Sequence, residues 1–191
     1  MTSLRMIVIA MIIIAVVAVS AIYMRKEGGE PLLADQRFQE LVSGKPEELS
    51  VAVEGLDPNG RFYKDYTCDG GNMAPKVKVT GVPGKAVTVA LIVYDPDAPR
   101  GTFIHWLAYQ DALETLTFPS PNAVEGRNDF RGVGYGGPCP PKGDNPHRYF
   151  FLAIALDDKL ELPRGYEIDD ILDSMRGHVV SWGYTVGTYS R

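Results

Sequence analysis

The side chains with the clearest capacity for chemistry are two aspartates and two histidines. Asp95 and Asp97 stand in the segment Asp95-Pro96-Asp97-Ala98-Pro99, five residues separate Pro99 from His105, and His147 precedes Arg148 and Tyr149. Carboxylates accept hydrogen bonds, and imidazole rings donate or accept them. Such a group can hold a small charged ligand, act as acid and base, or bind a metal. The residue types alone leave these three alternatives open.

The elements around Asp95 predict how these side chains are positioned. Residues 87–94 form an apolar run rich in β-branched types, which predicts a buried central strand. Pro96 and Pro99 lack a backbone donor and have a fixed φ, so we expect a stiff loop after the strand. Residues 103–109 predict the neighbouring strand, which would bring His105 back beside the acidic loop.

A second group of candidates follows a long region with little periodicity, residues 110–146. This region is rich in Gly, Pro, Asn and Asp, and its last part, residues 137–143, contains three prolines. Loops of this length inside a compact domain are unusual and tend to be functional. The proline-rich end delivers His147 to a second apolar strand, predicted over residues 150–156.

The remaining elements predict a mainly β protein. Residues 49–53 and 76–79 alternate as half-buried strands, and residues 179–189 form one or two more. Residues 168–175 predict a short amphipathic helix, and residues 33–42 form a helix or stay irregular. Several strands with long connections and few short helices favour an antiparallel β-sandwich over a barrel.

The N-terminus predicts a membrane segment. Residues 6–24 are nineteen uncharged, mostly apolar positions flanked by basic residues, and a helix of that length spans about 28 Å. We favour an uncleaved anchor with an extracytoplasmic domain, and secretion after signal cleavage is the alternative. The expected organisation is residues 1–24 as anchor or signal, 25–48 as linker and leading segment, and 49–191 as the β domain.

Charge excludes some classes of function. The chain has 24 acidic and 19 basic residues and a net charge of −5. No basic stripe compensates for this balance, so a nucleic-acid partner is not expected. A glycine-rich phosphate loop with its Lys-Ser/Thr is also missing from the sequence.

Two of the motifs together resemble signatures of the phosphatidylethanolamine-binding proteins, the family that includes the Raf kinase inhibitor protein. Residues 95–99 followed by His105-Trp106 are similar to the first signature, and residues 137–143 followed by His147-Arg148-Tyr149 to the second. Tyr66-Thr67-Cys68-Asp69-Gly70 resembles a third segment, typical of the prokaryotic branch. The resemblance covers about residues 61–189.

The resemblance implies a β-sandwich of this family's type with a small anion pocket at one end. Family members bind phosphate, phosphorylethanolamine or acetate-like anions there, and some inhibit kinases or serine proteases through contacts outside the pocket. The resemblance implies no catalytic residue, metal or cofactor. The implied ligand-binding residues, with Asp97 and Pro99 in supporting positions, are Asp95, Asp97, Pro99, His105, Pro140, His147 and Tyr149.

The carboxylate of Asp95 has to be reconciled with an anionic ligand, because it would repel a phosphate. It is compatible if it accepts a hydrogen bond from one histidine and keeps the other nitrogen of that ring protonated toward the ligand. The ammonium of phosphorylethanolamine could also pair with an aspartate. The first arrangement predicts weaker phosphate binding as the pH rises through the histidine titration.

Cys68 and Cys139 are the only two cysteines, and the resemblance places both near the pocket. In an exported domain they form either a disulfide or two buried thiols, and both alternatives remain open.

Three functions are compatible with the sequence. We favour a non-catalytic binding protein for phosphate or a phospholipid head group, held at a membrane by the N-terminal helix, with regulation of a partner protein as an additional role. An inhibitor of a serine protease or kinase would use residues 111–129, the only long variable-looking stretch. A metal-assisted or acid/base enzyme would use Asp95, His105 and His147, but no nucleophile stands in a recognisable elbow.

Overall fold

The computed structural model describes residues 33–191, and the unit considered below is Asp35–Arg191. The predicted membrane segment, residues 6–24, lies outside the described residues. Within residues 33–191, no helix is both long enough and apolar enough to cross a bilayer.

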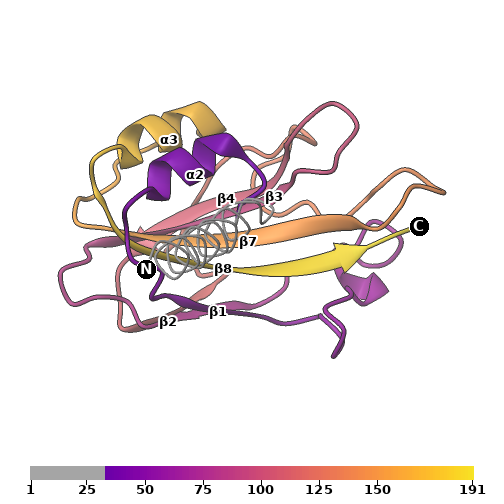
Figure 1. The fold of residues 1–191 in the computed structure, drawn as a ribbon, viewed down its shortest axis with the longest axis horizontal. Coiled ribbons are helices and arrows are strands. Elements are labelled where there is room, and N and C mark those ends of the chain that lie inside the picture. Colours follow the sequence, from indigo (N-terminus) through magenta and orange to yellow (C-terminus); the bar gives the residue numbers. More distant parts are fainter. Residues whose placement is uncertain (1–32) are drawn as a thin grey trace, which may run out of the picture. The chain divides into compact units, whose positions relative to one another are not determined.

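Two antiparallel sheets lie face to face (Figure 1). The smaller sheet has the order β1-β2-β5, and the larger has the order β6-β4-β3-β7-β8. These sheets and two short helices confirm the prediction of a mainly β, antiparallel fold. The strands are β1 (Ser50–Val53), β2 (Val77–Thr80), β3 (Thr88–Asp95), β4 (Phe103–Asp111), β5 (Thr115–Phe118), β6 (Val124–Glu125), β7 (His147–Leu156) and β8 (Val179–Tyr189).

The central strand β3 is buried along its whole length because both of its faces are covered. Successive side chains of a strand point to opposite faces. Val89, Leu91 and Val93 join the core between the two sheets, together with Val77 and Val79 of the smaller sheet. On the opposite face the Tyr94 ring lies 4.4 Å from the Phe38 ring. Because both faces of β3 are covered, this strand requires apolar side chains at successive positions.

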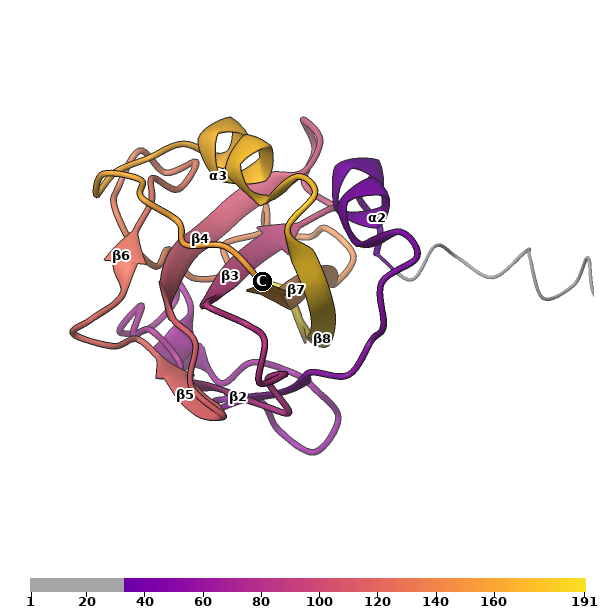
Figure 2. The same ribbon diagram turned by 90° about the vertical axis from the view of Figure 1, so that its left-hand side faces the viewer.

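Two helices, α2 (Gln36–Val42) and α3 (Ile168–Met175), cover the outer face of the larger sheet, opposite the smaller sheet (Figure 2). Asp35 caps α2, and its side chain accepts a hydrogen bond from the backbone N–H of Arg37 at 2.9 Å. In α3, the Asp170 side chain accepts from the backbone N–H of Glu167 at 2.8 Å. The bounds of α3 match the predicted helix, whose buried residues are Ile171, Leu172 and Met175.

The region predicted to be a long irregular loop, residues 110–146, contains regular structure. β4 continues to Asp111, and β5 and β6 follow within the region. In β5, Leu116 and Phe118 are buried while the two threonines are exposed. This alternation spans only four residues, so it is too short to stand out in a sequence. Residues 111–129, which the inhibitor alternative would use, therefore include the strands β5 and β6.

A glycine in β8, Gly183, allows the backbone just before β1 to approach this strand closely. The backbone N–H of Leu49, just before β1, donates to the carbonyl of Trp182 at 3.1 Å. A methyl group on Gly183 would overlap the carbonyl oxygen of Leu49, so any side chain here forces the two backbones apart.

Gly183→Ala is expected to lower the free energy of unfolding by about 1–3 kcal/mol, because the overlap is with backbone and cannot be relieved by a rotamer change. Urea unfolding of the two proteins measures this. Gly84→Ala is the matched control, since a methyl group there meets no atom within 4 Å, and it should change stability by less than about 0.5 kcal/mol. Equal effects of both substitutions would contradict the close approach.

Candidate functional site

A cavity of about 310 Å³ lies where β3 ends and β7 begins. It is lined by five of the seven predicted site residues, which are Asp95, Pro99, His105, Pro140 and His147. These residues come from three separate parts of the sequence and meet here because β4 and β7 are the two neighbours of β3.

A buried carboxylate–imidazole pair joins β3 to β7. Asp95 is 3% exposed, and its Oδ2 accepts a hydrogen bond from Nδ1 of His147 at 2.7 Å. Its Oδ1 accepts from the backbone N–H of Asp97 at 2.8 Å. Both oxygens therefore have protein donors, which a buried carboxylate requires. Hydrogen bonding to Asp95 leaves Nε2 of His147 as the ring nitrogen available for other partners.

His105 occupies a β-bulge. Val93 pairs with Trp106 and Tyr94 pairs with Ile104, so His105 is the extra residue of β4 in this ladder. A bulge re-aims the side chain that it carries, and bulges are common beside binding sites. Nδ1 of the ring donates to the carbonyl of Gly136 at 2.6 Å, and the backbone carbonyl of His105 accepts from the N–H of Gly136 at 2.8 Å. In the neutral ring this donation fixes Nε2 as an acceptor.

Burial lowers the pKa of His105, because a charged imidazolium loses hydration inside the protein. The hydrogen bond to Gly136 and the carboxylates of Asp95 and Asp129 oppose this effect without reversing it. The His105 ring is therefore uncharged at neutral pH.

Tyr149 lies beside His105 but does not itself line the cavity. Its ring is 5.1 Å from the His105 ring in an edge-to-face arrangement, and its buried hydroxyl has no hydrogen-bond partner among the described residues. Burial raises the pKa of Tyr149, and the Asp95 carboxylate, which lies close to the hydroxyl, adds to this effect, so the hydroxyl keeps its proton. No hydrogen bond of ordinary length satisfies this buried donor, which is unfavourable.

Asp97 does not line this cavity. Its carboxylate accepts hydrogen bonds from Nε and Nη2 of Arg148 at 2.9 and 2.7 Å, and from the backbone N–H of Arg148 at 2.9 Å. The hydrogen bonds from Arg148 hold the pKa of Asp97 below its usual range. The Asp97–Arg148 pair holds the loop after β3 against the first residues of β7, which fits the predicted supporting role of Asp97. Both residues border a neighbouring hollow with Asp144, whose Oδ2 lies 3.7 Å from Nε2 of His147.

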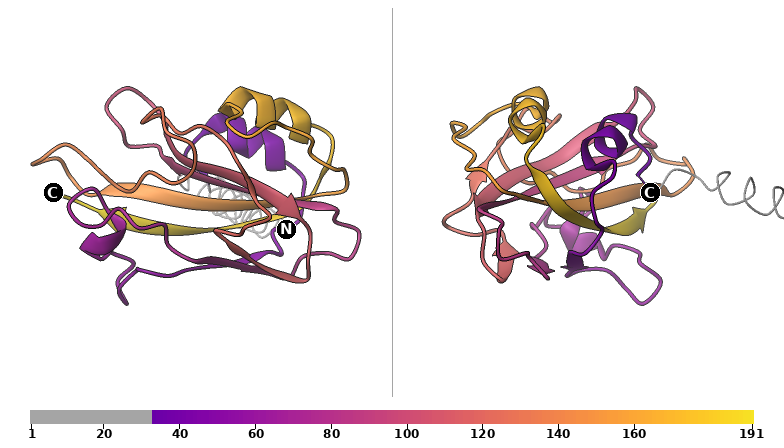
Figure 3. Two further views of the ribbon diagram at one scale, coloured as in Figure 1. Left: turned by 180° about the vertical axis from the view of Figure 1, so that it is seen from behind. Right: turned by 60° about the vertical axis from the view of Figure 1, so that its left-hand side comes forward.

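A disulfide joins Cys68 to Cys139 and fixes one wall of the cavity, which Cys139 and Pro140 line. The backbone N–H of Cys68 also donates to the carbonyl of Pro138 at 3.1 Å, and the N–H of Gly137 donates to Oδ1 of Asn72 at 2.7 Å. The loop before β7, the short helix η1 (Lys64–Tyr66) and the C-terminus lie at the same end of the domain (Figure 3). The proline-rich wall is therefore rigid.

Sequence reasoning missed several residues of the cavity. Gly136 supplies the carbonyl that orients His105, and Arg100, Phe103 and Phe130 line the mouth. Gly136 precedes the second motif directly, which was the available signal for it. Phe130 lies outside both motifs, seven residues before the second, and nothing in its neighbours marks it as part of the cavity.

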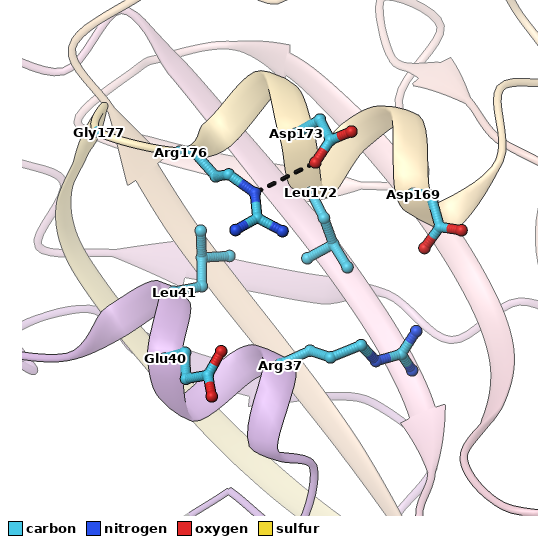
Figure 4. Close-up of a pocket in the computed structure, with 8 residues that line it drawn as sticks. All are labelled: Arg37, Glu40, Leu41, Asp169, Leu172, Asp173, Arg176 and Gly177. Carbon is cyan, nitrogen blue, oxygen red and sulfur yellow. Dashed lines mark hydrogen bonds and ion pairs between the residues drawn. The ribbon is translucent and has the colours of Figure 1, made fainter.

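A separate hollow of about 530 Å³ lies between α2 and α3 (Figure 4). Leu41 and Leu172 lie between the helices, and Arg37 extends from α2 toward Asp169 of α3. Its basic groups already have partners: Arg37 pairs with Asp35 at 2.9 Å and Arg176 with Asp173 at 3.1 Å. The cavity at the end of β3, with an unsatisfied buried hydroxyl close by, is the better candidate for a binding site.

The donor set does not form an evident metal centre. Among residues 33–191, no group of three or more His, Cys, Asp or Glu side chains is arranged to hold an ion.

Comparison with known proteins gives consistent matches. The family model described as phosphatidylethanolamine-binding protein matches residues 54–190. A UPF0098 protein of Pyrococcus horikoshii is 37% identical over 161 residues, which are 78% of this chain and 81% of that protein. A UPF0098 protein of Aquifex aeolicus is 42% identical over 137 residues, covering 67% of this chain and 80% of that protein.

Two solved structures are similar in fold. One is described as a putative phosphatidylethanolamine-binding protein homolog of Chlamydia trachomatis; it has a TM-score of 0.68 and 32% identity, and the match covers 76% of this chain and 99% of that one. The other is E. coli YbcL, described as a new member of the mammalian family. It has a TM-score of 0.68 and 28% identity, with 75% and 99% of the two chains covered.

The disulfide is expected to contribute about 2–4 kcal/mol to the free energy of unfolding, because it closes a long loop in the unfolded chain. The double substitution Cys68→Ala with Cys139→Ala should remove this contribution in urea unfolding. Wild-type protein in reductant should lose a similar amount, whereas the double variant should be insensitive to reductant. Labelling of both cysteines by an alkylating agent in unfolded, unreduced protein would contradict the disulfide.

Proposed function

The chain belongs to the phosphatidylethanolamine-binding protein family, and from this premise we propose that its domain binds a small oxyanion, such as phosphate or a phospholipid head group. The binding site is the cavity beside His105 and His147. Phosphorylethanolamine is the head group that the family's name suggests.

The observation that carries this proposal is the buried hydroxyl of Tyr149, which has no hydrogen-bond partner of ordinary length among the described residues and lies close to two residues of the cavity, Asp95 and His105. Its raised pKa keeps it a donor, and its ring lies against the His105 ring, whose Nδ1 is already bonded to the carbonyl of Gly136. An oxyanion would accept from this hydroxyl and end its unfavourable isolation. The stiff, disulfide-bonded wall lowers the cost of ordering the site on binding.

The hydrogen bonds of the two imidazole rings indicate that anion binding is linked to the uptake of a proton. Each imidazole already donates through Nδ1, His105 to Gly136 and His147 to Asp95. When both rings are neutral, each remaining Nε2 is an acceptor, which cannot bind an oxygen that carries no proton. Binding therefore brings one proton into the site, either on a ring nitrogen or on the ligand itself.

We propose binding without covalent chemistry. Among the described residues that line the cavity there is no serine, and the one cysteine, Cys139, is held in the disulfide. A thiolate nucleophile is therefore unavailable there.

The membrane attachment remains part of the proposal. Residues 6–24 would hold the domain at a membrane, on its extracytoplasmic side. The disulfide supports this side, because such bonds persist in oxidising compartments. Regulation of a kinase or protease through a surface outside the cavity stays a prediction from the family resemblance.

Tyr149→Phe is expected to weaken phosphate binding by about tenfold, because it removes one hydrogen bond to a charged ligand. Stability in urea should stay equal or rise, since a buried unpaired hydroxyl is lost. Calorimetric titration of the full chain with phosphate and with phosphorylethanolamine measures the affinities.

Tyr166→Phe is the matched control, because Tyr166 also has a buried hydroxyl without a partner among the described residues, but its ring packs against Tyr109 and not against His105. It should leave both affinities unchanged. An unchanged affinity in Tyr149→Phe would contradict the proposed site.

Sulfate should bind more weakly as the pH rises from 5.5 to 8, by up to about tenfold per pH unit where one proton is linked to binding. Sulfate does not titrate in this range, so the change reports proton uptake by the protein. Phosphate should lose less affinity, because its own P–OH can donate to a neutral Nε2.

The titratable groups that face the two rings are Asp95, Asp129, Asp144 and Tyr149. Equal, pH-independent binding of sulfate and phosphate would contradict the proposed proton uptake.

A further inference from the structure

Phe130 is an exposed aromatic residue at the mouth of the cavity. It is 49% exposed, and it lines the cavity together with Phe103, Pro99 and Pro141. Its ring lies 4.7 Å from the Phe103 ring and 5.5 Å from the His105 ring, both edge-to-face. A single exposed apolar side chain needs no explanation by itself. Phe130 differs because its ring continues the wall of a ligand-sized cavity.

The backbone on either side of Phe130 is held firmly. Asp129 is bonded to Ile104 of β4 twice, through its backbone N–H at 2.9 Å and through Oδ2, which accepts from the Ile104 N–H at 2.7 Å. The buried side chain of Asn128 accepts from Gly132 N–H at 3.1 Å and donates to the carbonyl of Gly134 at 2.8 Å. The turn that presents Phe130 is therefore preorganised.

The position of the ring depends on a missing side chain. A methyl group on Gly136 would overlap the Phe130 ring, so the glycine lets the ring settle beside His105. The same glycine donates to and accepts from His105. Gly136 therefore helps to position both the Phe130 ring and the His105 ring.

The cavity has two chemically different parts. Asp95, His105 and His147 form the polar part, and Phe103, Phe130 and the prolines form the apolar part. Its volume of about 310 Å³ equals roughly ten waters at ~30 Å³ each, which is much more than a phosphate group fills. The remaining space is bounded mainly by rings and prolines, which favour an apolar occupant.

We propose that the ligand is a phosphate monoester whose substituent is apolar and about the size of one ring, and that Phe130 selects it. This inference rests on the proposed function, because the phosphate occupies the same polar part of the cavity. The substituent packs edge-to-face or offset against Phe130 and Phe103, as aromatic groups prefer.

An ethanolamine substituent suits this mouth less well. Asp95 is the only carboxylate among the described lining residues, and both of its oxygens already accept hydrogen bonds. Arg100 adds a positive charge at the mouth, which repels an ammonium and attracts a phosphate. The site therefore favours an uncharged substituent over a cationic one.

Calorimetric titration of the full chain at one pH with phenyl phosphate, phosphorylethanolamine and inorganic phosphate tests this inference. Phenyl phosphate should bind about tenfold more tightly than either of the others, because ring burial against aromatic side chains adds to the phosphate contacts. Phe130→Ala should abolish most of this preference and change the affinity for inorganic phosphate by less than about twofold.

Tyr63→Ala is the matched control, since Tyr63 is a similarly exposed aromatic residue, at 54%, that does not line this cavity. Its preference should equal that of the wild type. Equal binding of phenyl phosphate and phosphate by the wild type would overturn the inference and leave the anion site standing. Binding of neither would overturn both, and a preference that survives Phe130→Ala would overturn the role of Phe130.

Discussion

The hydrogen bond between Asp95 and His147 is the interaction on which the site depends. A carboxylate buried this deeply is tolerated only with donors on both oxygens, and it obtains them from the start of β7 and from its own loop. The end of β3, the loop after it and the start of β7 are thereby fixed together. Arg148 repeats this connection one residue later through Asp97. The cavity thus forms where two acidic side chains at the end of β3, Asp95 and Asp97, obtain their hydrogen-bond donors.

The proposed anion site has no permanently positive side chain in its polar part. Arg148 is committed to Asp97, and Arg100, the only cation among the described residues that line the cavity, lies at the mouth. On this proposal, recognition depends on neutral donors and on the location of one proton. Such a site discriminates by the hydrogen-bonding state of its ligand more than by its charge. The aromatic mouth would add selectivity for the group to which the anion is attached.

Much of the fold could be predicted, because its longest elements follow simple periodicities. The run before Asp95 and the helix Ile168–Met175 are examples, and the proline-flanked motifs marked the residues that line the cavity. The short strands β5 and β6 could not be predicted, since two to four residues carry too little pattern. Phe130 was missed for another reason: its role comes from the turn that places it and from the space left at Gly136, which are properties of the tertiary structure.

The bulge at His105 serves the candidate site and not the pairing of the sheet. Val93 pairs with Trp106 and Tyr94 with Ile104, so a chain lacking this single residue would have an uninterrupted ladder between β3 and β4. The sheet itself has no need of the irregularity, and backbone pairing would be more complete without it. Selection for stability alone would therefore favour losing the residue. A relative that kept the fold but lost this residue would have the same architecture without the proposed anion site.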